Sequence, residues 1–594
     1  MSTVIFPYAY IPDPTKGKPI SNGQLFFGLP DLDPEIEANR ITVGLQQEDG
    51  TIVNIAPASQ PILTGAGGVP LYNGSPAIIV LDSSVAEYSL KILDKNNSQV
   101  YYNENASALV NSDEVKDIAG LFDNLAEAVA HDGFVGDFVQ TYEYNAGTAL
   151  GGAKYEVVAG GTGTSDGVLY IDMANGNQLK LIADGALNVY QSGALPDVAD
   201  QQTKIQAIVD AAVTLGAELD WSCPEDSEWL TSYPIVPKSN SSWIGKGTLR
   251  NNNPAGDVQS STLHIGGFNP VYFDPANPSV IGYSYFNLNA VGQESEVTLT
   301  NAGDASNFSQ GDLVWIVSDS SYEGNAGNYP LFAQLAVVEG TNGAVLSLDR
   351  SIAEDINADY GAAKIALAEQ DTVLDILGNP MRFCRNAKID GGLSLISDTA
   401  SCMQRGGMDQ CQLNFDTLKA KNVVFINAVC ATNISVNTIL CTRKAVDIAG
   451  SSQNFDIDIN NCFFAFDAAV SEDVSYARIG EGSRDGVVKI NNLQMEGFSF
   501  PLPVLQIDSG SHRAGFDVNQ VNAPDKTDVA FRFQSSVVPS GDQNSVLDCW
   551  MDIKNSQLSP NMVRGAFFND TAGASFMKRC GFKSLNINSG SFSL

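Results

Sequence analysis

Carboxylate side chains alternate with apolar ones between Phe455 and Asp458, a pattern that could support hydrolysis of a glycosidic bond. Successive side chains of a β-strand point to opposite faces, so Asp456 and Asp458 share one face, about 7 Å apart, while Phe455 and Ile457 face a core. Glycoside hydrolysis needs two carboxyl groups, one to protonate the leaving oxygen and one to act as nucleophile or to activate water. We therefore predict Asp456 and Asp458 as catalytic residues.

The same alternation recurs every 21 residues and adds Asp416 to the predicted catalytic cluster. The recurring apolar pairs are Leu413 and Phe415, Ile434 and Val436, and Phe455 and Ile457. One strand cannot bury an apolar face alone, so such units stack into a solenoid. In this register Asp416, Asn437 and Asp458 form a column with about 4.8 Å between strands. Repulsion among the carboxylates would keep one of them protonated, as a general acid requires, and we predict that Asn437 binds substrate.

Other interpretations of these residues stay open. Stacked Asp and Asn side chains also decorate the outer faces of solenoids without any role in chemistry. The carboxylates that compete for the catalytic role are Asp447, Asp467, Glu472, Asp473, Glu481 and Asp485. A lyase mechanism is a further alternative, with calcium on an Asp cluster and Lys444, Arg443 or Arg478 as the base. For the hydrolase we predict no cofactor and no metal site.

A loop expected between residues 319 and 330 carries the residue types of a carbohydrate contact site. Tyr322, Glu323 and Tyr329 combine two aromatic rings with a carboxylate. Ring faces stack on the C–H faces of sugars, and carboxylates bind hydroxyl groups. We predict these three residues as substrate-binding, the alternative being that the tyrosines are partly buried packing residues.

Other reaction classes lack their sequence signals. The three histidines, His131, His264 and His512, lie on separate segments, and the sequence has no Walker loop, HExxH or GxSxG motif. Nine cysteines without CxxC pairs predict free, buried thiols and folding in a reducing cytoplasm. We expect no signal peptide, because no charged n-region and no apolar h-region follow Met1-Ser2-Thr3. We expect no membrane insertion, because no apolar run approaches the roughly 20 residues of a membrane span. The net charge of −35 disfavours nucleic acid as a partner.

Residues 1–108 alternate short strands with turn signals, which predicts a small all-β domain. Their motifs are, in order, Asn22-Gly23-Gln24-Leu25-Phe26-Phe27-Gly28, Asp33-Pro34, Glu48-Asp49-Gly50-Thr51, Gly67-Gly68, Leu71-Tyr72-Asn73-Gly74 and Tyr88-Ser89-Leu90. With these motifs the segment resembles the head-binding domain of short-tailed bacteriophage tailspikes. The resemblance implies a homotrimeric adaptor that binds phage tail or portal proteins, and a virion protein assembled in the bacterial host cytoplasm.

The segments on either side of the solenoid are predicted from changes in period. Residues 109–132 carry a heptad stripe made of Val115, Ile118, Phe122, Leu125 and Val129, in a helix expected to start near Asn111. This helix is either a short trimeric neck or a helix packed on its own domain. Residues 133–192 are predicted as a small β segment, and residues 536–594 as a C-terminal β cap that locks a trimer.

Residues 193–535 are predicted to form a right-handed parallel β-helix. Further apolar pairs are Val488 and Ile490, Phe516 and Val518, and Met551 and Ile553. An amphipathic helix from Lys204 to Leu215 would cover the open first coil. The order of Gly193-Ala194, this helix and Gly245-Lys246-Gly247-Thr248-Leu249 resembles the entry segment of pectate-lyase-like proteins, a superfamily that includes tailspike depolymerases.

The resemblances imply an all-β homotrimer that binds a bacterial surface polysaccharide, either O-antigen or capsule. We expect it to depolymerise this glycan as an endo-glycosidase. The alternatives are a tailspike that binds the glycan without cutting it, a polysaccharide lyase, and a cellular enzyme of the pectate-lyase-like type.

Overall fold

The computed structural model describes most of the chain. The described residues are 3–5, 12–13, 18–47, 50–65, 67–82, 87–107, 118–255, 261–266, 284–319, 321–324, 327–330, 332–359, 361–368, 370–374, 380–381, 384–404, 407–427, 429–449, 452–465, 476–480, 482–496, 503–508, 510–524, 529–535, 546–558, 564–570 and 577–588. The chain forms two compact units, Met1–Asp117 and Ile118–Leu594. None of the described helices is long and apolar enough to cross a membrane.

The first unit contains two antiparallel four-stranded sheets. In sheet order, one consists of β1 (Thr3–Ile5), β10 (Ile78–Asp82), β5 (Val43–Gln46) and β6 (Ile52–Ile55), and the other of β12 (Gln99–Ser107), β11 (Glu87–Leu93), β4 (Gln24–Gly28) and β7 (Ile62–Leu63). Both sheets contribute buried side chains to one apolar core, which includes Leu25, Phe27, Val43, Ile79 and Ile92. The predicted small all-β domain is confirmed.

The second unit begins with a strand where the sequence predicts a helix. Strand β13 (Ile118–Asn124) pairs in parallel with β14 (Phe138–Glu143), and only α1 (Leu125–Ala130) is helical. Asn124 is the N-cap, because its side chain accepts a hydrogen bond from the Glu127 backbone N–H at 3.1 Å. The heptad helix predicted over 109–132 is therefore wrong between 118 and 124, and its start near Asn111 lies outside the described residues. Sheet pairing satisfies the backbone of this segment, whereas a helix of three heptads alone is marginal in water.

A five-stranded sheet and a capping helix lead into the solenoid. Strands β15 (Lys154–Val158), β17 (Gln178–Ile182) and β16 (Tyr170–Asp172) complete the sheet of β13 and β14. Helix α2 (Gln202–Leu215) buries Ile205, Ile208 and Val209, and it ends at Gly216, whose φ is 64°. The helix follows β18 (Leu187–Asn188), which pairs in parallel with β19 (Glu218–Asp220) at the start of the large sheet. The predicted amphipathic helix is therefore present at the predicted position.

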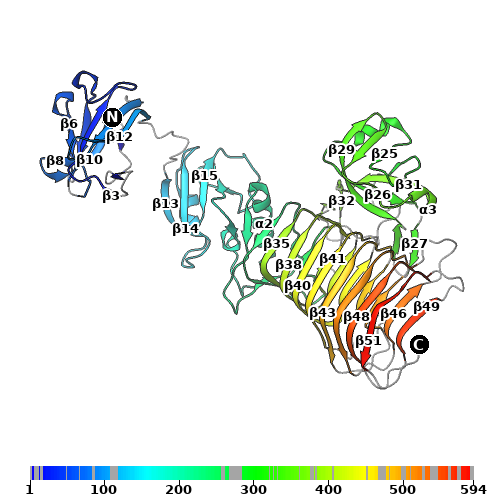
Figure 1. Cartoon of the computed structure of the whole chain (residues 1–594). Helices are drawn as coiled ribbons and strands as arrows, with labels where there is room; N and C mark the ends of the chain where they lie inside the picture. The colour runs from blue at the N-terminus through cyan, green and yellow to red at the C-terminus, as the bar shows by residue number, and fades with distance from the viewer. Residues whose placement is uncertain are drawn as a thin grey trace. The chain divides into compact units, whose positions relative to one another are not determined.

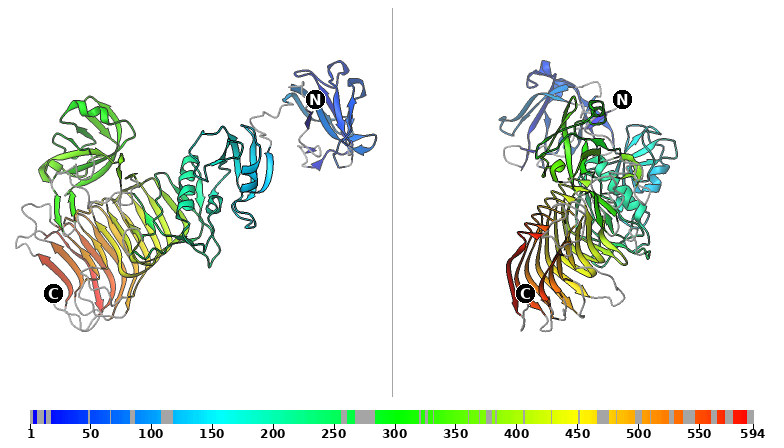
Figure 2. Two further views of the ribbon diagram at one scale, coloured as in Figure 1. Left: turned by 180° about the vertical axis from the view of Figure 1, so that it is seen from behind. Right: turned by 90° about the vertical axis from the view of Figure 1, so that its right-hand side faces the viewer.

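Parallel strands then wind into coils with three faces (Figure 1). The first face consists of β21 (Ser242–Ile244), β35 (Lys388–Ser397), the first halves of β38 (Gln412–Asn427) and β40 (Asn433–Ala449), and β41 (Asp456–Ala465), β43 (Val487–Glu496), β45 (Gly515–Ala523), β48 (Trp550–Leu558) and β51 (Gly581–Asn588). Strand β22 (Thr248–Asn251) pairs with β35 on the first face. The second face runs from β23 (Leu263–His264) to β36 (Ser401–Gln404), the second halves of β38 and β40, and β42 (Ala477–Ile479), β44 (Leu505–Ile507), β46 (Val529–Ser535) and β49 (Arg564–Asp570). The coils are seen from behind and from one side in Figure 2.

The third face is short and turns each coil back toward the first. It holds β34 (Cys384–Arg385), β37 (Met408–Asp409) and β39 (Val429–Cys430), and later β47 (Val546–Leu547) and β50 (Met577–Lys578). A corner residue with positive φ stands two positions before each strand of the first face from β21 to β51. These residues are Asn240, Asn386, Gln410, Ala431, Asn454, Asp485, Arg513, Asp548 and Arg579, with φ between 47° and 62°. Most are Asn or Asp, the types that tolerate this left-handed conformation best after glycine.

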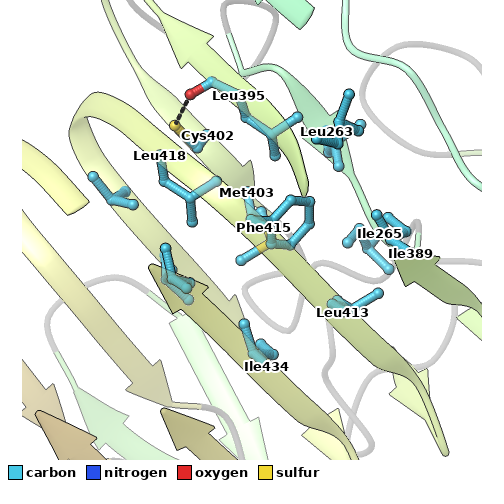
Figure 3. Packing of buried hydrophobic residues seen from close by; sticks show 14 of the residues in the cluster. Leu263, Ile265, Ile389, Leu395, Cys402, Met403, Leu413, Phe415, Leu418 and Ile434 are labelled. Carbon is cyan, nitrogen blue, oxygen red and sulfur yellow. Dashed lines mark hydrogen bonds between the residues drawn. The ribbon is translucent and has the colours of Figure 1, made fainter. Parts of the chain in front are cut away.

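Inward side chains of successive coils form one continuous core (Figure 3). The first step has the predicted length, because Leu413 pairs with Ile434 and Phe415 with Val436. The next step is 23 residues, not 21, because Val436 pairs with Ile459. The predicted stack of Val436 on Ile457 is therefore wrong by two positions. An even shift keeps each side chain on its predicted face, so the β-helix itself is confirmed.

The β-helix also continues beyond the predicted end at residue 535. Strand β48 pairs in parallel with β45, and β51 pairs with β48. The described residues of this segment therefore contribute further coils, and the separate C-terminal cap predicted over 536–594 is wrong for residues 550–558 and 581–588. Steps of 35 and 31 residues between these strands hide the repeat in the sequence.

A separate antiparallel domain is inserted between β23 and β34. Its sheet order is β24 (Phe286–Asn287), β31 (Ala363–Leu367), β26 (Leu313–Ser318), β29 (Ala333–Asn342), β30 (Val345–Leu348) and β25 (Glu296–Thr298), and α3 (Ile356–Asp359) follows β30. The inserted domain has its own apolar core. It is joined to the third face by Arg350, which donates to the buried Asp409 at 2.8 Å, and by Glu354, which accepts from Arg513 at 2.8 Å. A small hairpin in it pairs β27 (Ser321–Gly324) with β28 (Gly327–Pro330).

Candidate functional site

A groove of about 540 Å³ opens at the corner between the third and first faces. It is lined by Asn454, Phe455, Asp456, Asp485, Gly486, Val487, Arg513, Asp517, Trp550 and Lys583. These residues lie just before or near the beginning of β41, β43, β45, β48 and β51, so five successive coils form the groove. We call this surface the Trp550 groove.

The Trp550 indole lies flat on a glycine. A Cβ atom at residue 515 would lie 2.5 Å from Trp550 Cδ2, so only the absence of a side chain at Gly515 lets the ring rest there. The Lys583 ammonium lies 3.8 Å from the centroid of the ring, in a cation–π contact. Lys583 is exposed, so when its ammonium moves aside the ring offers an aromatic face beside carboxylates, which can stack on the C–H face of a sugar and bind its hydroxyls.

Two carboxylates stand side by side next to Trp550. Strand β45 pairs Asp517 with Asp552 of β48, and neighbouring strands lie about 4.8 Å apart. Asp517 pairs with Lys554 at 3.2 Å, and Asp552 accepts a hydrogen bond from the Ser584 hydroxyl. Carboxyl groups about 5–5.5 Å apart are the arrangement used by retaining glycoside hydrolases.

Asp456 also faces the Trp550 groove, with Asp458 two positions further along the same strand as predicted, and a lysine of the next coil binds it. The Lys489 Nζ donates to Asp456 Oδ2 at 2.7 Å and stands in register with Asp458. Hydrogen bonding to Asp456 raises the pKa of Lys489, and the charges of Asp458 and Asp517 act in the same direction. The second oxygen of Asp456, Oδ1, is shielded from solvent and has no hydrogen-bond partner. The exposed part of Asp456, 44% of its side chain, is therefore on the side of Oδ2, which Lys489 already binds.

Asp416 belongs to a different column, so the predicted cluster of three carboxylates is wrong. Asp416 accepts from Asn437 at 3.0 Å, and Asn437 in turn accepts from Asn460 at 3.1 Å. The chain of amides continues from Asn460 to Asn491 at 3.0 Å and from Asn491 to Asn519 at 3.1 Å. We call these residues the amide ladder. They are the stacked polar side chains of the alternative interpretation, and a substrate-binding role of Asn437 stays a prediction.

Asp447, a competing carboxylate, lies in a buried ionic network on the second face. Its side chain is 0% exposed, Arg478 Nε lies 2.8 Å from Oδ1, and Lys444 Nζ contacts Oδ2. Burial opposes the charged form, but Arg478 and Lys444 outweigh it and hold the pKa of Asp447 at about 2. The same burial lowers the pKa of Lys444. We call Lys444, Asp447, Arg478 and Asp508, which lies 3.6 Å from Arg478, the Asp447 network.

The structure describes only some of the other predicted site residues. Asp467, Glu472, Asp473 and Glu481 lie outside the described residues. Tyr322 and Tyr329 are paired in the β27–β28 hairpin, with Glu323 next to Tyr322, so the predicted loop is a hairpin. Within the described ranges, no three His, Cys, Asp or Glu side chains gather as ligands for a metal ion.

Sequence reasoning missed Trp550, Asp517, Asp552 and Lys583. A signal for the two carboxylates was available: each stands between apolar residues of a predicted pair, Phe516 and Val518 or Met551 and Ile553. The position of Trp550 beside Gly515 depends on steps of 28 and 35 residues between β43, β45 and β48. These steps have no regular repeat from which the register can be counted.

Comparisons with known proteins match the N-terminal segment. A family model described as head binding covers residues 3–110. The tail spike protein of Shigella phage Sf6 is 38% identical over 88 residues, 15% of this chain and 13% of that protein. A putative tail fiber protein, gp36, of Acyrthosiphon pisum secondary endosymbiont phage 1 is 37% identical over 82 residues, 14% of this chain and 22% of that protein. The chain thus matches less than a quarter of the length of either relative.

Two solved structures match over most of the chain at low identity. WceF of Pantoea stewartii, a glycan biofilm modifying enzyme with a bacteriophage tailspike-like parallel β-helix fold, matches over 95% of this chain and 63% of its own, with 11% identity and a TM-score of 0.31. The enzymatically active domain of tailspike protein 4 of bacteriophage CBA120 matches over 88% and 60%, with 13% identity and a TM-score of 0.35. Sequence identities and TM-scores this low give no information about the activity of this chain. Over residues 3–110 this chain resembles the head-binding segment of bacteriophage tail spike proteins, and its second unit contains a parallel β-helix.

Proposed function

We propose that this protein is a homotrimeric phage tailspike that attaches the virion to a bacterial surface polysaccharide, O-antigen or capsule. The head-binding match over residues 3–110 supports attachment of the first unit to the phage tail or portal proteins. This assigns the protein to the virion tail, after assembly in the host cytoplasm. The β-helix is then the part that meets the host.

The observation that carries the glycan proposal is the Trp550 groove. It combines a fixed indole face with the carboxylates of Asp456, Asp485 and Asp517 in one elongated surface across five coils. A polysaccharide is a repeating, hydroxyl-rich chain, and a groove open along the helix axis accommodates such a chain better than a closed pocket does. The net charge of −35 favours a neutral or weakly acidic glycan, because a highly acidic one would be repelled.

We further propose that the groove cleaves its glycan by hydrolysis at Asp517 and Asp552. Asp517, ion-paired with Lys554, attacks the anomeric carbon while the carboxyl group of Asp552 transfers a proton to the leaving oxygen. The glycosidic C–O bond breaks and a glycosyl ester of Asp517 forms. Asp552 then takes a proton from water, which attacks the ester and releases the sugar with a new reducing end. Asp456 and Asp458, the pair predicted from the sequence, are the alternative carboxylates on the same face.

The Asp447 network supports a second candidate reaction, β-elimination of an acidic glycan. Burial lowers the pKa of Lys444, which suits the base of a lyase. The nearby guanidinium of Arg478 is the type of group that binds the carboxylate of a uronate. Against it, Lys444 is 13% exposed and is already held by Asp447. A third candidate is a tailspike that binds without cleaving.

Purified surface polysaccharides from a panel of bacterial hosts test these candidates. We expect one polysaccharide to bind and to yield new reducing ends without the ultraviolet absorbance of unsaturated sugars. Asp517→Asn and Asp552→Asn should each lower the rate by about 10²–10⁴-fold while binding persists. Asp416→Asn, in the amide ladder, is the matched control and should cleave at the wild-type rate.

Each other outcome selects a different candidate. Unsaturated products whose formation requires Lys444 would identify a lyase, and binding without any product would identify an adhesin. Full activity in both Asp517→Asn and Asp552→Asn would remove these residues from the mechanism and return attention to Asp456 and Asp458. If Trp550→Ala binds the polysaccharide as tightly as the wild type, the Trp550 groove is not the glycan site.

A further inference from the structure

A second polar cleft, of about 410 Å³, lies where the inserted domain meets the first coils of the β-helix. Asn240, Arg385 and Asn386 line it from the corners of two neighbouring coils, and Asp312, Leu313 and Leu367 line it from strands β26 and β31. The volume falls within the roughly 300–1,000 Å³ of small-molecule sites. The cleft shares no lining residue with the Trp550 groove. We call it the corner cleft.

Two asparagine amides are fixed side by side in this cleft. Asn240 and Asn386 are left-handed corner residues of neighbouring coils, with φ of 62° and 55°. Their backbones are tied to the coils, because Asn240 N donates to Arg385 O at 2.7 Å and Asn386 N donates to Asp409 O at 3.0 Å. Asn386 Nδ2 donates to Asn240 Oδ1 at 3.3 Å. This contact leaves Asn240 Nδ2 as a donor and Asn386 Oδ1 as an acceptor for a ligand.

Arg385 supplies a donor whose charge is already balanced. Its Nε lies 3.4 Å from Asp409 Oδ2, and its guanidinium lies 3.9 Å from Asp349. The Nε–H is shielded from solvent and makes no hydrogen bond of acceptable geometry. Because this N–H is shielded, a ligand meets the outer part of the guanidinium instead, and 27% of the Arg385 side chain is exposed.

The charges in the cleft decide which class of ligand fits. The carboxylates of Asp312, Asp349 and Asp409 would repel an anionic ligand, and the guanidinium of Arg385 would repel a cationic one. Only Leu313 and Leu367 are apolar, which is too little for an apolar ligand. The cleft combines hydrogen-bond donors and acceptors with the small apolar surface of Leu313 and Leu367. A neutral sugar has matching groups, because its vicinal hydroxyls donate and accept and its C–H face is apolar.

We propose that the corner cleft binds one neutral sugar residue of a glycan. Asn240 Nδ2 and the exposed end of the Arg385 guanidinium donate to ring hydroxyl oxygens, and Asn386 Oδ1 and Asp312 accept from hydroxyl groups. The sugar C–H face rests on Leu313 and Leu367. Because the cleft has its own residues, this binding does not depend on cleavage in the Trp550 groove.

Ligand-observed NMR with the full-length protein tests the site directly. The probes are neutral monosaccharides at millimolar concentration (glucose, galactose, mannose, rhamnose and N-acetylglucosamine), with glucuronic acid as the charged comparison. We expect saturation transfer to at least one neutral sugar, and binding about tenfold weaker in the double variant Asn240→Ala/Asn386→Ala, because two ligand hydrogen bonds are lost. Asp312→Asn should also weaken binding.

Gln410→Ala is the matched control. Gln410 is a left-handed corner residue one coil further on, outside the cleft, and Ala431 shows that alanine is accommodated in this column of corners. No transfer to any neutral sugar, unchanged binding in the double variant, or tighter binding of glucuronic acid would each overturn the proposal. Loss of the same signal in Trp550→Ala would place the sugar in the Trp550 groove instead, and would leave the proposed function standing.

Discussion

Two clusters of aspartate, lysine and arginine side chains on the β-helix, the Asp447 network and the Trp550 groove, differ in burial. In the Asp447 network the carboxylate is 0% exposed, and the two cations that contact it are 13% and 20% exposed. In the Trp550 groove, Asp456 and Asp517 keep 44% and 38% of their side-chain surface, and their lysine partners are 41% and 51% exposed. The residue types are the same, but one set is closed to water and the other is open to a ligand.

The difference shows that burial, more than residue type, decides what a charge cluster can do. Removing ions from water is costly, and a buried ion pair persists only where its partners are close and well placed. Such a cluster links strands, and a substrate could use its atoms only by displacing the ion pairs that hold them. An exposed pair adds little stability, so its side chains can exchange partners when a ligand arrives.

The sharpest test of this comparison is the same substitution in both regions. Asp447→Asn leaves Lys444 and Arg478 buried without their anion, and we expect the free energy of unfolding to fall by roughly 3 kcal/mol. Asp456→Asn removes an exposed partner of Lys489, and we expect a change within about 0.5 kcal/mol. Urea unfolding followed by tryptophan fluorescence measures both. Equal losses in the two variants would contradict the distinction drawn from burial.

Acid should act on the Asp447 network in a defined pH window. The pKa of Asp447 is about 2 in the folded chain, below the ordinary 3.8, so this group favours folding above pH 3.8 and the contribution is lost as the pH falls through 2. The shift corresponds to about 2 kcal/mol. The difference in unfolding free energy between the wild type and Asp447→Asn should therefore shrink by that amount between pH 5 and pH 2. A constant difference across that range would show that Asp447 is not held as an anion.

In the Trp550 groove, a substitution at Gly515 tests whether the fixed position of the indole matters. In Gly515→Ala the new Cβ would lie 2.5 Å from both the ring and the backbone oxygen of Trp550, so the indole must move. We expect polysaccharide affinity to fall about tenfold, or about 1.4 kcal/mol. Gly581→Ala is the matched control, because Gly581 pairs with Trp550 on the next coil and its Cβ would meet nothing within 4 Å. Equal affinity in both variants would show that the fixed indole is not needed.

The sequence predicts which side chains point outward better than it predicts which residues stack on one another in successive coils. Alternation places Asp456, Asp458 and Asp416 outward, and the structure agrees, because facing depends only on a period of two. Columns depend on the number of residues in each coil. A step of 23 instead of 21 moves Asp458 away from Asn437 and beside Ser435. The predicted cluster failed for this reason, although every one of its side chains is on the predicted face.

The corner residues contain a register signal that a repeat count does not use. An Asn or Asp with left-handed backbone stands two positions before many strands of the first face, as Asn454 and Asp485 do. Aligning coils on these positions gives the observed pairing of Asp456 with Val487. Burial of the Asp447 network depends on side chains of several coils meeting in space, and no local pattern around Asp447 contains that information.

The smallest expected effect concerns the amide ladder, which stands beside the Trp550 groove on the same face. Asn460→Ala removes the hydrogen bond to Asn437 and the one from Asn491, both between exposed side chains. Water replaces exposed hydrogen bonds at little cost, so we expect a loss of about 1 kcal/mol or less in unfolding free energy. Polysaccharide binding and cleavage should be unchanged, because the ladder uses its amides on itself. If Asn460→Ala weakens glycan binding as strongly as Gly515→Ala, the ladder belongs to the glycan surface, and the boundary of the groove must move toward the middle of the face.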